Sequence, residues 1–146
     1  MSDVERKEKL YEDAREIELL VGSFESCAVP AAEFGHGAHL VVALWYLTAL
    51  PAPEACARMC EGLRRYTRHN DAESAYNETT TLFWLRLVRH FLDHTDSTRP
   101  LAELANELTR TYHSSKLIFD YYSRDLIQTP EAKTSWVKPD LKPLDF

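Results

Sequence analysis

Apolar residues recur at every third or fourth position along most of the chain, which is the spacing of one face of an α-helix. In the N-terminal segment this spacing predicts a highly charged helix over residues 1–22, which ends near Gly22. Its apolar stripe consists of Leu10, Ala14, Ile17, Val21 and Phe24. Pro30 and Gly35 interrupt the pattern further on, so the residues around them are predicted to form a connector.

The same periodicity predicts further helices, separated by prolines and polar runs. The second runs from Gly35 or His36 to Leu50, the third starts at Pro53, the fourth takes Asp71 or Ser74 as its N-cap, the fifth follows Thr98 or Pro100, and the sixth spans residues 114–128. After Pro130 one more turn is expected, followed by an extended tail over residues 135–146 that packs on the bundle. The predicted fold is an all-α, single-domain helical bundle of about five to six helices, covering residues 1–146.

The length and composition fit one globular domain. The chain has 146 residues, of which 45% are hydrophobic and 27% charged, which suffices for a core without disulfides. Its formal net charge of −6 disfavours a nucleic-acid partner, because phosphate binding needs a clustered basic face. The one basic cluster, Arg64 to His69, is interpreted as a solvated helix end.

Several features predict a cytoplasmic protein that does not enter a membrane. Three cysteines are odd in number and badly spaced for a disulfide scaffold, so a reducing compartment is expected. The charged N-terminus lacks the apolar centre of a signal peptide. The most apolar stretch, Ala38 to Leu50, is shorter than the about 20 residues that a membrane helix needs.

Two histidines stand three residues apart at the start of the second predicted helix, in the sequence EFGHGAHL. Helical projection places His36 and His39 on the same broad stripe as Leu40 and Leu47, so both face the core. This spacing lets both imidazoles reach one metal ion. The alternative is that each ring is a core histidine with its own hydrogen-bond partner.

Glu78 is the candidate third metal ligand. Projection of the fourth helix places it on a stripe that is apolar apart from Arg89, and a buried carboxylate needs a cation, a hydrogen-bond network or a metal. The alternative is that Glu78 serves the first turn of its helix, where the helix dipole favours a negative charge. His90 and His94 project to another face and are not expected to join this site.

Polar residues near the C-terminus are candidates for ligand binding. Tyr121, Tyr122 and Arg124 lie in a mixed aromatic and polar segment, and their hydroxyl and guanidinium groups can orient a substrate or hold an anion. The alternative is that the tyrosine pair packs the C-terminal tail and that Arg124 pairs with an acid. Cys56 and Cys60 share a stripe with apolar residues and are interpreted as core thiols.

Several short motifs resemble those of an uncharacterised bacterial helical family for which no activity is established. They are F-E-x-C-x-x-P from Phe24, H-x-x-H-L from His36, Y-N-E-T from Tyr76 and Y-Y-S from Tyr121. The resemblance covers most of the chain and implies that one site contains Cys27, His36, His39, Tyr76, Glu78 and Thr79. Asn77 departs from the family pattern, which commonly has His there, and metal binding would be lost or altered if that His were a ligand.

The preferred functional hypothesis is a metal-dependent enzyme that acts on a small molecule. His36, His39 and Glu78 would hold a divalent metal ion, either zinc for hydrolysis or iron for oxygen chemistry. The candidate catalytic residues are Tyr76 and Cys27, which would move protons or tune and shield the ion, and the candidate substrate-binding residues are Thr79, Tyr121, Tyr122 and Arg124.

Two other functional classes stay open. The first is a non-catalytic binding or sensing module, whose polar pocket would hold a small ligand through His39, Tyr76, Glu78 and Arg124. The second is a structural or interaction protein that uses its charged first helix and acidic surface for a partner. A homodimer is compatible with a bundle of this size.

Overall fold

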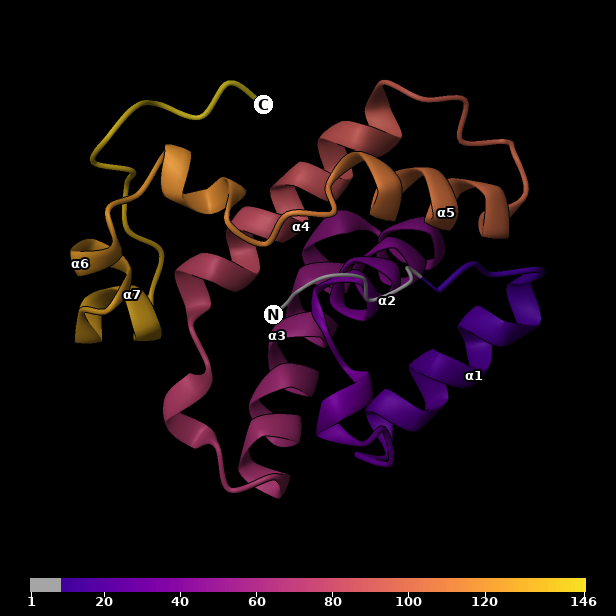
Figure 1. Cartoon of the computed structure of the whole chain (residues 1–146), viewed down its shortest axis with the longest axis horizontal. Coiled ribbons are helices and arrows are strands. Elements are labelled where there is room, and N and C mark those ends of the chain that lie inside the picture. Colours follow the sequence, from indigo (N-terminus) through magenta and orange to yellow (C-terminus); the bar gives the residue numbers. More distant parts are fainter. Residues whose placement is uncertain (1–8) are drawn as a thin grey trace, which may run out of the picture.

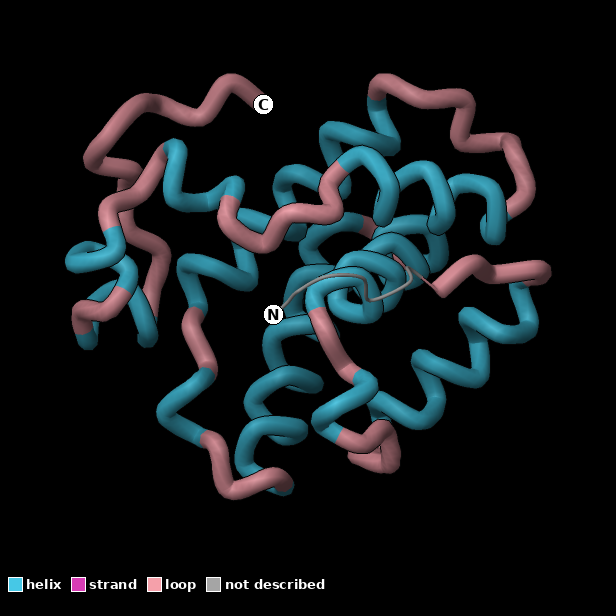
Figure 2. Tube along the Cα trace, viewed as in Figure 1, coloured by secondary structure: helices cyan, strands magenta, loops and turns pink. Residues whose placement is uncertain are grey.

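A computed structural model describes residues 9–146 as helices joined by loops (Figures 1 and 2). The helices are α1 (Ala14–Glu25), α2 (His36–Ala49), α3 (Ala52–His69), α4 (Glu78–Asp93), α5 (Leu101–Thr111), α6 (Arg124–Ile127) and α7 (Pro130–Thr134). Short 3₁₀ turns form η1 (Ala31–Glu33), η2 (Glu73–Ala75) and η3 (Leu117–Asp120). This part of the chain contains no strand, so the predicted all-α bundle is confirmed.

Helix α2 forms the centre of the bundle. The five consecutive residues from Leu40 to Leu44 are each at most 2% exposed. A helix that is apolar on every side is stable only when other elements surround it. Here α1, α3, α4 and α5 pack around α2 (Figure 1), and the two histidines in its first turn are half-buried.

A second, smaller core joins the C-terminal segment to α4. Its centre is Phe83 of α4, which is fully buried. The segment contributes Ile118, Tyr121, Tyr122, Trp136, Val137, Leu144 and Phe146. Helices α6 and α7 and the tail lie on the opposite side of α4 from α1 (Figure 1). Residues 135–146 contain no helix and pack on this core, which confirms the predicted extended tail.

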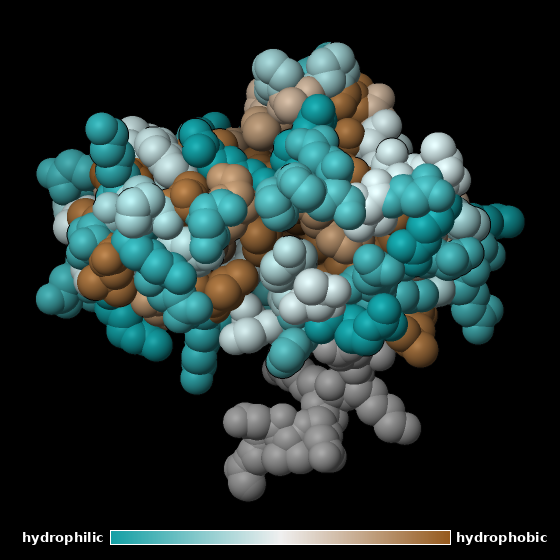
Figure 3. Space-filling view, turned by 90° about the horizontal axis from the view of Figure 1, so that it is seen from above, coloured by the Kyte–Doolittle hydropathy of each residue, from teal (hydrophilic) through white to brown (hydrophobic). Residues whose placement is uncertain are grey.

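The face of the molecule drawn in Figure 3 is mainly hydrophilic. Figure 3 shows polar side chains over most of one face, with hydrophobic side chains visible between them, some on the side where the C-terminal segment lies. Large hydrophobic side chains that lie exposed include Leu10, Leu19 and Leu141. They belong to separate stretches of the chain, and scattered exposed apolar residues of this kind are ordinary.

The N-terminal helix begins later than the sequence predicts. Residues 1–8 of the predicted helix lie outside the described part of the chain, and residues 9–13 precede α1. Asp13 is the N-cap, and its carboxylate accepts a hydrogen bond from the Glu16 N–H at 3.1 Å. Leu10, predicted to lie in the apolar stripe, is outside the helix and 68% exposed.

The segment before α1 is held to α5 by one side-chain amide. Asn106 accepts a hydrogen bond from the Tyr11 N–H at 2.8 Å and donates one to the Tyr11 carbonyl at 2.9 Å. Both backbone groups of Tyr11 are therefore satisfied without a helix. The spacing of apolar residues cannot predict a hydrogen bond between two distant segments. For this reason the start of the N-terminal helix was predicted wrongly.

Helix α4 begins at Glu78, later than the predicted N-cap at Asp71 or Ser74. The N-cap is Asn77, whose side-chain oxygen accepts a hydrogen bond from the Thr80 N–H at 2.9 Å. The prediction was wrong because several consecutive polar residues can each cap a helix, and the tertiary fold selects one of them. Glu78 consequently occupies the first turn of α4, as the helix-dipole alternative requires.

The predicted sixth helix is divided into two short elements. Residues 117–120 form η3, and α6 starts only after Ser123. The Ser123 hydroxyl accepts a hydrogen bond from the Leu126 N–H at 3.1 Å, so this side chain starts a new helix instead of continuing the previous one.

Two glycines provide a matched test of the packing between α1 and α3. A Cβ atom at Gly62 would lie 2.6 Å from a ring carbon of Phe24, whereas one at Gly22 would have no neighbour within 4 Å. We expect Gly62→Ala to lower the free energy of unfolding by about 1–3 kcal/mol. Gly22→Ala is expected to raise it by about 0.5–1 kcal/mol, since alanine favours a helix interior. Urea unfolding of the two variants checks both signs, and equal effects would contradict the close approach of α3 to Phe24.

Candidate functional site

The Y-N-E-T motif lies where α4 begins beside α3, and its first and third residues belong to a polar cluster. The Glu78 carboxylate accepts hydrogen bonds from the Tyr76 hydroxyl at 2.5 Å and from the Arg64 guanidinium at 2.8 Å. The guanidinium also lies over the Tyr76 ring, 5.1 Å from its centroid. The Glu78 side chain is only 17% exposed, and Arg64 supplies the cation that a buried carboxylate needs.

The surroundings of this cluster keep its hydroxyl and thiol groups protonated. Burial raises the pKa of Tyr76 far above its ordinary value, and the hydrogen bond to Glu78 raises it further. The thiol of Cys60 touches the same hydroxyl, and burial raises its pKa as well. A neutral phenol and a neutral thiol are poor proton acceptors and poor nucleophiles. The cluster is therefore suited to hold a fixed shape rather than to transfer protons.

The second and fourth residues of the motif tie α4 to the C-terminal segment. The amide nitrogen of Asn77 donates to the Ile127 carbonyl at the end of α6 at 2.8 Å. The fully buried Thr79 hydroxyl donates to the Ser135 carbonyl at 2.9 Å and accepts from the Val137 N–H at 3.2 Å. Thr79, which the sequence predicts to bind substrate, thus forms hydrogen bonds with the backbone on both sides of Trp136.

The two tyrosines predicted to bind substrate hold the C-terminal tail. The Tyr121 hydroxyl donates to the Asp145 carboxylate at 2.6 Å, and the Tyr122 hydroxyl donates to the Val137 carbonyl at 2.7 Å. Burial raises the pKa of each tyrosine to about 12, so both hydroxyls stay protonated as donors. The alternative in which this pair packs the tail describes the arrangement observed.

Arg124, the remaining predicted substrate-binding residue, lies exposed at the start of α6. Its guanidinium lies over the Phe119 ring, 4.0 Å from the centroid. No ion pair of Arg124 with an acid is found within residues 9–146, so that part of the alternative stays a prediction.

His36 and His39 lie in the first turn of α2, and each bonds a backbone carbonyl. The Nε2 atom of His36 lies 2.9 Å from the Tyr112 carbonyl oxygen. The Nδ1 atom of His39 lies 2.7 Å from the Gly35 carbonyl oxygen, and its ring stacks on Phe34 with the centroids 4.1 Å apart. Since a carbonyl only accepts hydrogen bonds, these nitrogens carry hydrogen, and the other nitrogen of each neutral ring is an acceptor.

The three predicted metal ligands are not brought together as one group. Glu78 bonds Arg64 and Tyr76, whereas His36 and His39 each bond a carbonyl. Among residues 9–146, no group of three His, Cys, Asp or Glu side chains is placed so that it could hold a metal ion. Zinc or iron binding stays a prediction, and the arrangement of these side chains does not add to its support.

Cys27, the second predicted catalytic residue, ends helix α1 with a left-handed backbone, φ 59°. Its N–H donates to the Phe24 carbonyl at 3.0 Å, and the Ala28 N–H donates to the Ser23 carbonyl at 2.7 Å. These are the two hydrogen bonds of a Schellman motif, in which glycine is usual because a side chain costs about 1–2 kcal/mol there. The motif carries α1 to Glu25, beyond the predicted end near Gly22.

A basic pocket with a volume of about 330 Å³ opens beside the Tyr76 cluster, between α3, η2 and α7. It is lined by Arg64, Thr67, Arg68, Glu73, Ser74, Tyr76, Lys133 and Thr134. The Lys133 ammonium donates to the Ser74 carbonyl at 3.2 Å, which connects α7 to the turn before α4. Three cations and several hydroxyl groups thus face one hollow, and Glu73 is the one carboxylate among the lining residues.

The sequence pattern did not reveal this pocket because its residues come from separate segments. The sequence pattern predicts only a solvated helix end for Arg64 to His69. Arg64 and Arg68 are nevertheless four residues apart and therefore share a helix face. Nothing in the sequence around Lys133 indicates that it belongs to a pocket, because its position opposite these arginines depends on how α7 packs.

The chain matches no family model, no curated protein and no solved structure. The similarity of its motifs to the uncharacterised bacterial family therefore stays a resemblance. None of the helices within residues 9–146 combines the length and the hydrophobicity that a membrane crossing requires.

Removal of the Thr79 hydroxyl tests how the C-terminal segment is held. In Thr79→Val, the Ser135 carbonyl and the Val137 N–H lose their partner, and we expect the free energy of unfolding to fall by about 1–3 kcal/mol. Amide hydrogen exchange should accelerate at Val137. The control is Thr48→Val, because the exposed Thr48 hydroxyl bonds only the Trp45 carbonyl of its own helix. Equal stability of the two variants would contradict the bridging role of Thr79.

The histidines predict a pH dependence of stability. Burial lowers the pKa of His36 and of His39 below the ordinary value of 6.5. As pH falls through 6.5, the unfolded chain takes up protons that the folded chain resists, so the free energy of unfolding decreases toward pH 5. This decrease should be smaller in His36→Gln/His39→Gln than in the wild type. His69→Gln, at the exposed end of α3, is the control. Chemical unfolding at several pH values measures the slopes, and an unchanged slope in the double variant would refute the assignment.

Proposed function

We propose that this protein is a non-catalytic module that binds a small anionic molecule in the basic pocket. The proposal rests on one observation, the convergence of Arg64, Arg68 and Lys133 from α3 and α7 on a single hollow. The chain as a whole is acidic, with a formal net charge of −6, so composition does not account for a positive lining. Guanidinium and ammonium groups in such an arrangement suit phosphate or carboxylate groups.

One of the three cations is positioned before a ligand arrives. Glu78 and the Tyr76 ring hold the Arg64 guanidinium in one orientation. A donor that is already ordered loses less conformational entropy on binding, which favours affinity. The same carboxylate offsets part of the Arg64 charge, so Arg64 contributes geometry more than net attraction.

The other two cations supply the net positive charge. Within residues 9–146, neither Arg68 nor Lys133 takes part in an ion pair. Lys133 uses one of its three N–H donors on the Ser74 carbonyl, and two are left for a ligand. The hydroxyl groups of Thr67 and Thr134 lie on the same hollow, but each donates its hydrogen to a backbone carbonyl of its own helix, so the charged side chains are the donors for anion oxygens.

The size of the pocket restricts the ligand. A volume of about 330 Å³ is at the lower end of the range for small-molecule sites. This volume fits a phosphorylated or polycarboxylate metabolite of a few carbon atoms and excludes a large cofactor.

The side-chain positions support binding more than the metal-dependent catalysis that the sequence suggests. Tyr76 and Cys60 are neutral, and Glu78 already has Arg64 as its counterion. A group of this kind can shape one wall of a pocket, but it offers no free base to activate water.

A charge-removing variant in the pocket tests the proposal. Calorimetry with glycerol 3-phosphate, inorganic phosphate and citrate is expected to show binding of at least one of them to the wild type. In Arg68→Gln the affinity should fall about fivefold or more, because a charge-assisted contact is lost. The control is Arg65→Gln, which removes the same charge from an exposed position on α3 outside the pocket. Treatment with EDTA should leave binding unchanged.

The proposal would be contradicted by any of three results. These are absence of binding for all three anions, equal affinities in the two variants, and binding that EDTA abolishes. The last result would favour the metal-dependent hypothesis instead, and metal analysis of His36→Ala/His39→Ala would then show whether these histidines hold the ion.

A further inference from the structure

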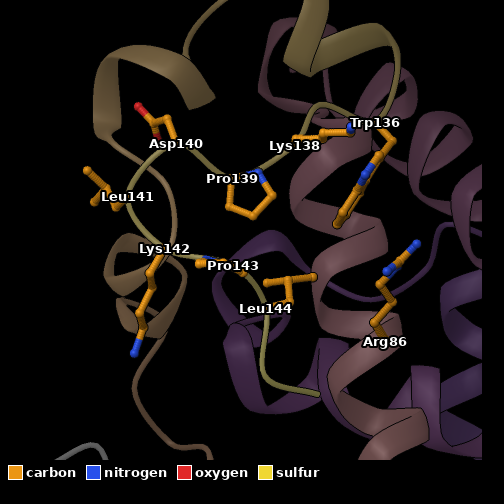
Figure 4. A pocket seen from close by; sticks show the side chains of 9 residues that line it. All are labelled: Arg86, Trp136, Lys138, Pro139, Asp140, Leu141, Lys142, Pro143 and Leu144. Carbon is orange, nitrogen blue, oxygen red and sulfur yellow. The ribbon is translucent and has the colours of Figure 1, made fainter.

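A second hollow, with a volume of about 480 Å³, lies between the C-terminal tail and α4 (Figure 4). Its walls include Arg86 of α4 and, from the tail, Trp136, Lys138, Pro139 and Leu144. It shares no lining residue with the basic pocket, and the proposed function does not use it. The indole, the proline ring and the leucine side chain form an apolar wall at one side of the loop (Figure 4).

The indole on this wall is held in place by its neighbours. The Thr79 hydroxyl bonds the backbone at Ser135 and at Val137, the residues on either side of Trp136. The Trp136 ring also meets Tyr122 edge-on, with the centroids 6.2 Å apart. An aromatic surface fixed in this way offers contact area to a ligand without a large cost in conformational entropy.

Hydrogen bonds also hold the part of the loop that contains Asp140 and Leu141. The Asp140 carboxylate accepts hydrogen bonds from the Ser123 N–H at 2.7 Å and from the Ser123 hydroxyl at 2.6 Å. The Leu141 N–H donates to the Tyr121 carbonyl at 2.9 Å. These bonds keep the tail at a distance from α4, so the hollow is a built feature of the fold rather than a loose loop.

The charges around the hollow are mainly positive. Arg86, Lys138 and Lys142 line it, and no ion pair of these three side chains occurs in the described part of the chain. The Arg86 guanidinium lies over the Trp136 ring, 4.5 Å from its centroid, so the cation and the indole are in direct contact. Asp140, the one acidic side chain of the lining, is occupied by Ser123. An apolar wall beside unpaired cations is complementary to a molecule with an apolar body and a negative end.

We propose that this hollow is a binding site for a small aromatic acid. The aromatic body packs against Trp136, Pro139 and Leu144, and the carboxylate lies beside Arg86 and Lys138. The interaction is non-covalent, and both parts of the ligand are needed, because neither an exposed cation pair nor an open apolar wall binds tightly alone.

The probe for this site is 2-naphthoate, followed by the indole N–H resonances of the full-length protein. We expect the Trp136 resonance to shift on titration, while those of Trp45 and Trp84, which lie outside the hollow, serve as internal references. The uncharged analogue 2-naphthamide and the non-aromatic acid acetate should each bind about fivefold more weakly or worse. Arg86→Gln should weaken 2-naphthoate binding by a similar factor.

The matched control is Arg89→Gln, which removes the same charge from the same helix. Arg89 is exposed and pairs with Asp93 outside the hollow, so its loss should leave the affinity unchanged. Equal affinities of the two variants, equal binding of naphthoate and naphthamide, or no shift of the Trp136 resonance would each overturn the proposal. An acidic peptide that shifts the same resonance at lower concentration than 2-naphthoate would point to a protein partner and overturn it as well.

Discussion

The hydroxyl group of Thr79 carries two hydrogen bonds at the point where the helical bundle meets the C-terminal segment. The Thr79 side chain is fully buried, and its removal would deprive the Ser135 carbonyl and the Val137 N–H of their shared partner. The bonded residues, Ser135 and Val137, come directly after the end of α7 and on either side of Trp136. Lys133 of the basic pocket and Trp136 of the second hollow therefore take their positions from one buried side chain of α4.

Both hollows show that local charge can oppose the overall charge of a protein. The chain is acidic, yet the charged residues that line each hollow are three cations and one carboxylate, and two nearby carboxylates are bonded to other groups. Glu78 is held by Arg64, and Asp140 is held by Ser123. A negative surface elsewhere does not remove the attraction for an anion inside a hollow, since solvent and salt screen distant charges more than near ones.

The paired histidines show that a spacing compatible with metal binding is also compatible with ordinary hydrogen bonding. Projection of α2 turns His36 and His39 toward the core; in the structure both are half-buried, and a half-buried imidazole still needs a partner for its ring nitrogens. Backbone carbonyls provide those partners, one from the same helix at Gly35 and one from the end of α5 at Tyr112. Metal-bound histidines also donate their second nitrogen to such groups, so these bonds are compatible with a ligand role but do not require it.

The sequence by itself determined the all-α class, the extent of α2 and the start of α3 to within about one residue, and the packed tail after α7. Those features follow from local periodicity and from the positions of prolines. Both can be read from a single segment of the sequence without knowledge of the rest of the fold. Tertiary structure decided the rest. The long-range bonds of Asn106 to Tyr11 set where α1 can begin, and the packing of α7 on α4 brings Lys133 to the same pocket as Arg68. Such pairings depend on the packing of distant segments, and no pattern within one helix contains that information.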